Sequence, residues 1–213
     1  MKKIAVLALV LLVFVGGYFG YQHYTSKELI KSATPTVKEA TLRTKQIADF
    51  ITSPSNATFA EIFKAANETV QKISELSITL ESQNREANPD AIAAASDYLK
   101  AVQTLTRSIN SIFRIRLDTR SASSAADDAL EDLKSSNEYT RKYAKTRVDK
   151  ALEKMKSNLD EMIAQDKEIV IAITNTETAR ANAAKYFPED ALLSPATLQE
   201  LKKDFVKEEK KAE

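Results

Sequence analysis

Glycine is nearly missing from this 213-residue chain, and its absence excludes several classes of site and fold. The three glycines are Gly16, Gly17 and Gly20, so none occurs from Tyr21 to the end. Phosphate-cradling loops and dinucleotide turns need glycine where the backbone passes close to the ligand. Sandwiches and barrels with many tight turns need it as well. The sequence therefore disfavours nucleotide sites and most all-β folds.

Cysteine and tryptophan are absent, and His23 is the single histidine. Without cysteine the chain has no disulfide, thiolate zinc site or thiol nucleophile. A serine–histidine pair would have to use His23, which lies beside the apolar N-terminal segment. Acid pairs such as Asp127/Asp128 and Asp160/Glu161 occur without a calcium-binding loop or a Glu-x-x-His helix, so solvated helix faces explain them. We therefore expect no enzyme activity, no metal and no cofactor.

Neither sign of charge dominates the chain. It carries 31 Lys and Arg against 30 Asp and Glu, and the first 25 residues hold two lysines and no acid. The remainder therefore has a net charge of −1. A chain this balanced produces no long-range field that would attract nucleic acid or an anionic surface. No nucleic-acid partner is expected.

A long apolar run follows the N-terminal Lys2 and Lys3. Residues 4–21 carry no charge. As a helix this segment would span about 27 Å, close to the thickness of the hydrocarbon core of a bilayer. Tyrosines at its far end suit the membrane interface, and the two lysines hold the N-terminus inside. We therefore predict an uncleaved anchor in a bacterial inner membrane, with the rest of the chain in the periplasm or outside.

The competing interpretation of this run is a signal peptide cleaved near Gly17, with Val15 at the −3 position. It would leave a secreted or periplasmic protein. The chain stays apolar and aromatic beyond that point, which favours the anchor. His23 lies between Tyr21 and Tyr24, where a place at the membrane interface explains it better than pH sensing.

Proline divides the rest of the chain into helices. Four of the five prolines follow a helix-capping residue, in Thr34-Pro35, Ser53-Pro54, Asn88-Pro89 and Ser194-Pro195. The capping side chain accepts a free backbone N–H, and proline has none to leave unsatisfied. Pro188 predicts a helix stop. Between these points Ala, Glu, Lys, Leu and Gln favour helix throughout residues 25–186.

Apolar residues recur in steps of three and four, the spacing of coiled-coil-like packing. One stripe consists of Ile92, Ala95, Leu99, Val102, Thr106, Ile109 and Phe113. A second seam is predicted at Val148, Leu152, Met155, Leu159, Met162, Asp166, Ile169 and Ile173. Asp166 is either a buried polar residue that fixes the register or is rotated outward. The predicted fold is an all-α antiparallel bundle of helices about 30 residues or longer, preceded by a transmembrane or signal helix.

The third turn of this bundle has two solutions. A turn near residue 122, with Ser124 to Asp127 as a capping box, gives helices over 26–52, 55–84, 89–120 and 124–186. A turn near residue 136 gives two long arms, 89–134 and 138–186, and brings Arg114 near Asp160. Charge pairing fits both solutions, and helix length favours the first.

Two groups of side chains are candidates for contact with a ligand or partner. The first consists of four arginines on one predicted helix: Arg107, Arg114, Arg116 and Arg120. Guanidinium groups bind carboxylates and phosphates bidentately, and the alternative is pairing with the acidic residues of 127–138. The second group is Tyr139 and Tyr143, one helical turn apart in a stretch poor in aliphatic residues. Exposed aromatics mark partner surfaces, and the alternative is the edge of the core.

The chain thus divides into an anchor (1–24), a helical bundle (25–187) and a short helix with a charged, frayed tail (188–213). The absence of a catalytic constellation favours a non-catalytic, membrane-tethered protein of the bacterial cell envelope. Such a protein acts through protein–protein interaction, as a scaffold, adaptor or accessory subunit. Its expected partners are the membrane, through residues 4–21, and another protein or a second copy. The alternative is a sensor-like module that binds a small anionic ligand through the Arg107–Arg120 group.

Overall fold

The computed structural model describes the backbone of residues 2–53, 57–83 and 85–212, and the side chains of 21–53, 57–83 and 86–206. Within these residues there are five α-helices, two 3-10 turns and no strand. In chain order they are α1 (Lys2–Thr52), α2 (Phe59–Glu81), η1 (Arg85–Ala87), α3 (Pro89–Asp132), α4 (Glu138–Ala183), η2 (Glu189–Ala191) and α5 (Pro195–Ala212). The predicted all-α class is confirmed, and the helices pack against one another.

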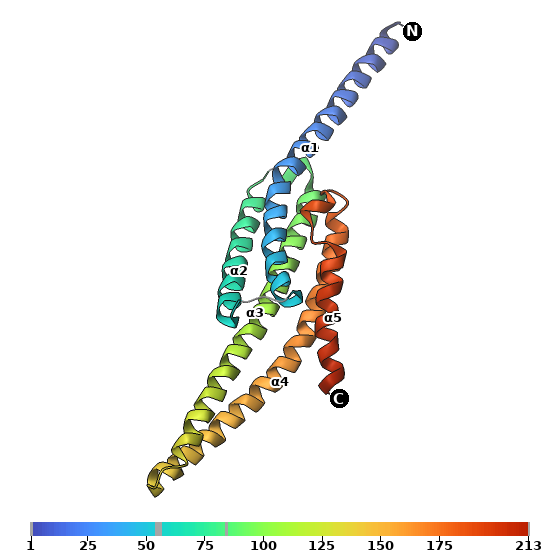
Figure 1. Ribbon diagram of the computed structural model, residues 1–213. Coiled ribbons are helices and arrows are strands. Elements are labelled where there is room, and N and C mark those ends of the chain that lie inside the picture. The colour runs from blue at the N-terminus through green and yellow to red at the C-terminus, as the bar shows by residue number, and fades with distance from the viewer. Residues whose placement is uncertain (1, 54–56, 84, 213) are drawn as a thin grey trace.

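The helices form two regions, which we call the body and the arm (Figure 1). The arm is residues 114–163, where α3 and α4 continue as a pair beyond the end of α2. In the body, α3 packs against α2 and α4, while α5 packs against α4 and α1. α1 leaves the opposite end of the body as a single helix (Figure 1). The N-terminus and the tip of the arm therefore lie at opposite ends of the molecule.

Large apolar side chains fill the body. All seven residues of the stripe predicted between Ile92 and Phe113 are buried, which confirms that prediction. Tyr98 and Leu105 lie beside this stripe and are completely buried, and Ile173 of α4 is buried as well. Full burial of such a side chain contributes about 1.5–3 kcal/mol. The body therefore has a core that specifies how its helices pack.

A buried tyrosine ties the α4–α5 connection to the body. The Tyr98 hydroxyl lies 2.7 Å from Thr41 Oγ1 and accepts the Leu193 N–H at 2.8 Å. Thr41 Oγ1 donates in turn to the Ala191 carbonyl at 2.7 Å. Burial raises the pKa of the Tyr98 hydroxyl, because the interior disfavours the phenolate. Every group in this chain of hydrogen bonds is neutral and has a partner.

The C-terminal segment contains a helix where a short one was expected after residue 188. α5 begins at Pro195, where the predicted cap Ser194 accepts the Thr197 N–H on its hydroxyl at 3.1 Å, and the helix runs to Ala212. Leu201 and Phe205 are buried against the body. The alternation of charged and apolar residues here reflects one exposed and one packed helix face.

The helix start predicted at Thr34-Pro35 is wrong, because α1 passes through Pro35 without a break. Proline removes one backbone hydrogen bond from a helix interior. Pro35 lies on the exposed side of α1, away from the packed face of the helix. Val37 and Ala40 on the other side are fully buried, and this packing maintains the helix. The boundary expected at residue 24 also lies inside α1.

Of the other helix boundaries predicted from proline, two are confirmed and one is displaced. Asn88 caps α3, with Pro89 as its first residue, as predicted. α4 ends at Ala183, before Pro188. α2 begins at Phe59 rather than after Pro54, which lies outside the described residues. Its cap is Thr58, which accepts the Glu61 N–H on its side chain. The Glu61 carboxylate accepts the Thr58 N–H and the Thr58 hydroxyl, and these two hydrogen bonds lower the pKa of Glu61.

The third turn lies at residues 133–137, so the preferred solution near residue 122 is wrong and the rival near 136 is correct. Residues 119–124 lie inside α3 and contain no glycine or proline to stop it. The serines in this stretch lower its helix propensity, but packing against α4 keeps it helical. Asn137 then caps α4, with its Oδ1 accepting the Tyr139 and Thr140 N–H groups at 2.9 and 3.3 Å.

Candidate functional site

The arm is the part of the molecule where large side chains lie outside and small ones lie inside. Its two helices meet through Ala126 and Ala129 of α3 and Ala144 and Ala151 of α4, all of which are buried. Ile115, at the base of the arm, is buried as well and has a large aliphatic side chain. Alanine lets two helix backbones approach closely but supplies little apolar area. The arm is therefore a thin hairpin rather than a second core.

Asn158 is the polar residue of this seam, and it was missed by the sequence analysis. It is only 1% exposed, and its Nδ2 donates to Thr119 Oγ1 at 3.1 Å. A buried amide of this kind fixes the register of paired helices, because any slip leaves it without its partner. The signal available in the sequence was the seven-residue spacing of Ala144, Ala151 and Asn158.

Asp166, the polar seam residue predicted from sequence, lies where α4 enters the body and is 8% exposed. Of the two positions predicted for Asp166, buried in the seam or rotated outward, the structure has the buried one. Ile169 and Ile173 follow it in the same seam and are completely buried.

The first half of the predicted α4 seam is only partly covered, contrary to expectation. Leu152 is 54% exposed and Leu159 is 55% exposed. Val148, Met155 and Met162 are half-buried at the edge of the contact with α3. The alanine spacing, displaced by one position from the leucine spacing, determines which side of α4 meets α3. Leu152 and Leu159 are therefore left uncovered along the arm, while Val148, Met155 and Met162 are partly covered.

Two of the four arginines make contacts in the structure. Arg114 donates to Glu161 of α4 at 2.5 Å, one residue from the Asp160 expected for a turn near 136. Arg116 lies over the rings of Phe59 and Phe113, at 5.6 and 5.9 Å from their centroids. These contacts lie on different sides of α3, since positions two apart on a helix differ by about 200°.

The remaining two arginines, Arg107 and Arg120, are exposed. Contacts on different sides of α3 are therefore seen for Arg114 and Arg116. Of the acidic residues considered as their alternative partners, Asp132 instead accepts from Arg147 of α4 at 2.7 Å.

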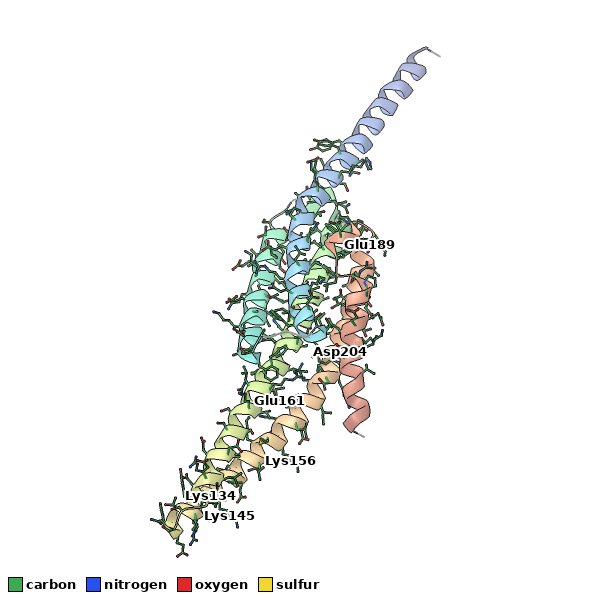
Figure 2. All side chains as sticks on the ribbon, viewed as in Figure 1. Lys134, Lys145, Lys156, Glu161, Glu189 and Asp204 are labelled. Carbon is green, nitrogen blue, oxygen red and sulfur yellow. The ribbon has the colours of Figure 1, made fainter. Side chains whose placement is uncertain are left out.

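Two exposed tyrosines mark the tip of the arm. Tyr139 is 80% exposed and Tyr143 is 61% exposed, on the first turns of α4. They lie among charged side chains, including Lys134 and Lys145 in Figure 2. Aromatic residues in such surroundings are typical of surfaces that bind another protein.

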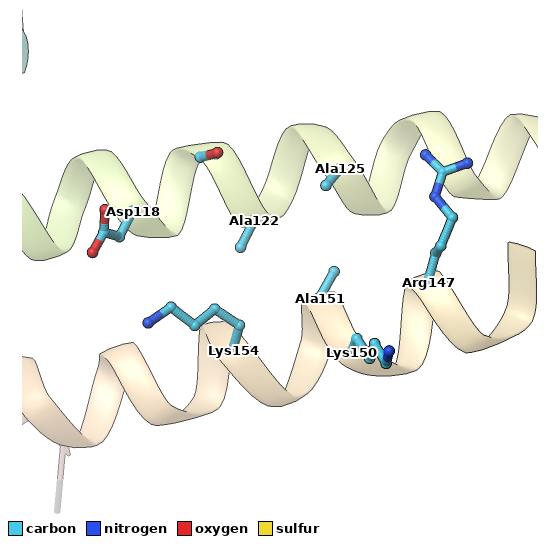
Figure 3. Close-up of a pocket in the computed structure, with 8 residues that line it drawn as sticks. Asp118, Ala122, Ala125, Arg147, Lys150, Ala151 and Lys154 are labelled. Carbon is cyan, nitrogen blue, oxygen red and sulfur yellow. The ribbon is translucent and has the colours of Figure 1, made fainter.

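Charge is unevenly divided between the two helices of the arm. Residues 141–156 of α4 carry seven basic and two acidic side chains, while residues 127–132 of α3 carry four acidic ones. A groove of about 450 Å³ lies between the two helices (Figure 3). Its lining comprises Asp118, Ser121, Ala122, Ala125, Arg147, Lys150, Ala151 and Lys154. The alanines form a shallow apolar floor between charged rims, a shape that suits a protein surface better than an enclosed small molecule.

Among the residues with described side chains, no cluster of His, Cys, Asp and Glu is arranged to hold a metal ion. Within the same residues, no helix contains a stretch that is apolar enough to cross a membrane. The side chains of residues 4–20, which make up most of the predicted anchor, lie outside this description.

The comparisons with known proteins give no relative from which a function could be transferred. No protein-family model, no curated protein and no solved structure matches this chain.

Proposed function

We propose that this protein is a non-catalytic, membrane-tethered helical bundle of the bacterial cell envelope that presents its arm to a protein partner. It would serve as a scaffold, adaptor or accessory subunit. The observation that carries the proposal is the arm itself, because it places large apolar side chains in solvent at the end of the molecule farthest from the N-terminus. Exposed leucine and tyrosine side chains on a projecting hairpin are a feature of protein-binding surfaces.

The tether is supported by the N-terminal sequence and by the course of α1. Residues 4–21 carry no charge, and the helix that contains them stands clear of the body. Tyr21 and Tyr24 are exposed where α1 approaches the body, a position that suits the membrane interface. In this arrangement Lys2 and Lys3 stay in the cytoplasm, while the body and arm lie in the periplasm or outside the cell.

Membrane fractionation combined with N-terminal sequencing of the purified mature chain tests the tether. We expect the chain to begin at Met1 or Lys2 and to require detergent, rather than high salt, for extraction from the membrane. A mature chain that begins after Gly17 and is recovered in the soluble fraction would contradict the tether and establish the cleaved-signal alternative.

Photo-crosslinking in living cells tests the partner surface. A photoreactive amino acid at Tyr139 or Tyr143 of the full chain should give a discrete crosslinked product. The matched control is the same substitution at Ile78, an exposed apolar position on α2 in the body. Equal labelling from all three positions, or none from the arm, would contradict the assignment of the arm to protein contact.

A further inference from the structure

We infer that a partly exposed apolar stripe of α4 is an antiparallel docking surface for the arm of a second copy of this chain. The inference rests on the proposed function only in assigning the arm to protein contact. The stripe consists of Val148, Leu152, Met155, Leu159 and Met162, in alternating steps of four and three residues. This is the repeat with which one helix packs against another in a coiled coil.

Contacts within the chain cover this stripe only in part, because Val148, Met155 and Met162 are half-buried at the edge of the contact with α3. α4 meets α3 through Ala144, Ala151 and Asn158, which lie one position to the side of the stripe. Leu152 and Leu159 consequently remain more than half exposed. A lone helical hairpin gains nothing from leucines exposed at heptad spacing on its outer face, whereas a helix that packs against another copy does.

Charge selects one orientation and one register for the second copy. Asp149 and Lys156 both flank the stripe on the side away from α3, seven residues apart, and both are exposed. When two α4 helices run antiparallel with Leu152 opposite Met155 of the second copy, each Asp149 lies beside the other copy's Lys156. The pair forms twice, by symmetry.

The same register aligns the apolar residues. Val148 faces Leu159 of the second copy, and Leu152 faces Met155, so each layer is repeated by the two-fold axis. A shift by one heptad in either direction places Asp149 opposite Asp149 or Lys156 opposite Lys156, and like charges destabilise the contact. In a parallel pair, Asp149 and Lys156 would have only alanine or asparagine residues of the second copy beside them, and no opposite charge. Antiparallel pairing is therefore the arrangement in which apolar and charged contacts agree.

Single cysteines test this arrangement directly, because the chain has no cysteine of its own. One full-length chain carries Val148→Cys and a second, of distinguishable mass, carries Leu159→Cys. Mixed in detergent and oxidised, they should form the mixed disulfide. Two copies of the same variant hold their cysteines about 16 Å apart along the helix axis, too far for a disulfide.

The matched control pairs Leu42→Cys with Ile78→Cys, since both positions are exposed apolar sites on the body. Mixed disulfide above this control supports the antiparallel contact. Disulfides within each variant alone would indicate a parallel pair and overturn the inference, as would no disulfide above the control.

Charge reversal supplies a second measurement that leaves the stripe intact. Asp149→Lys and Lys156→Asp should each raise the dimer dissociation constant roughly fivefold in sedimentation equilibrium. The chain with both substitutions should return to the original value, because the reciprocal pairs form again with reversed sign. Glu153→Lys, at an exposed position outside the stripe, is the control for charge alone. Additive weakening in the double variant would overturn the pairing.

Antiparallel arms direct the two N-termini away from each other, which separates this inference from the tether. Full-length protein reconstituted into phosphatidylcholine vesicles should cluster the vesicles, and a Leu152→Asp/Leu159→Asp variant should not. The mixed disulfide in detergent without vesicle clustering would retain the second-copy contact and contradict the tether. Absence of both would overturn the second-copy contact, and fractionation would still test the tether on its own.

Discussion

The body and the arm share α3 and α4 but are stabilised in different ways. In the body these helices bury Tyr98, Leu99 and Ile173, whereas in the arm they meet through alanines such as Ala129 and Ala144. Burial of a large side chain contributes about 1.5–3 kcal/mol, and a methyl group contributes about 0.8 kcal/mol. The arm therefore depends on continuing helices that the body has already nucleated. The same pair of helices can thus build a core at one end and display its apolar residues at the other.

Leucine truncation should separate the two regions most clearly. Leu99→Ala should lower the free energy of unfolding by about 2–5 kcal/mol, because it opens a cavity in the body. Leu159→Ala, at an exposed position in the arm, should change it by less than about 0.5 kcal/mol. Urea unfolding followed by circular dichroism measures both, at a chain concentration below that at which copies associate. A large loss for Leu159→Ala would show that the arm has a core of its own.

Overpacking should test the close approach of the arm helices. Ala129→Leu forces a large side chain into the alanine seam and should cost about 1–3 kcal/mol. Hydrogen exchange should locate the loss in residues 114–163, with protection of the body unchanged. The control is Ser124→Leu, an exposed position on the same helix. Equal exchange in the two variants would mean that the seam is not tightly packed.

Removal of one hydroxyl should weaken the body by less. Tyr98→Phe leaves the Leu193 N–H without its acceptor and should cost about 1–2 kcal/mol in urea unfolding at neutral pH. Since burial raises the pKa of Tyr98, the wild-type chain should hold its stability below the ordinary tyrosine pKa of about 10 and lose it as the pH rises further. The phenylalanine variant should lack this part of the alkaline loss. An identical pH profile in both chains would contradict the burial of a neutral Tyr98.

Periodicity and capping were sufficient to predict the all-α class, the buried stripe of α3 and the starts of α3 and α5. These features follow from local chemistry: Asn88 and Ser194 each accept an N–H at the start of their helix. Pro35 misled the prediction because the packing of Val37 and Ala40 outweighs one lost hydrogen bond. A capping residue followed by proline shows that a helix could start at that position, and tertiary contacts decide whether it does.

The α4 seam could not be assigned from the leucine spacing alone. Both the leucine stripe and the alanine spacing have the helical repeat, and hydrophobicity ranks the leucines first. In the structure the small residues face α3, because close approach of the helices and the Asn158–Thr119 hydrogen bond require them there. The buried alanine spacing lies one position away from the leucine spacing. The leucine spacing alone therefore does not predict which side of α4 is exposed.

The unbroken course of α1 has a mechanical consequence. α1 is a single rod of 51 residues, from the N-terminal segment to the face that packs in the body. With no loop between them, tilt or rotation of the first residues is transmitted to the body as a rigid movement. Because each residue advances a helix by about 100°, the number of residues between Tyr21 and Leu29 sets the direction in which the arm points. One residue inserted in this interval would turn the body and the arm by more than a quarter of a circle relative to the first residues of α1.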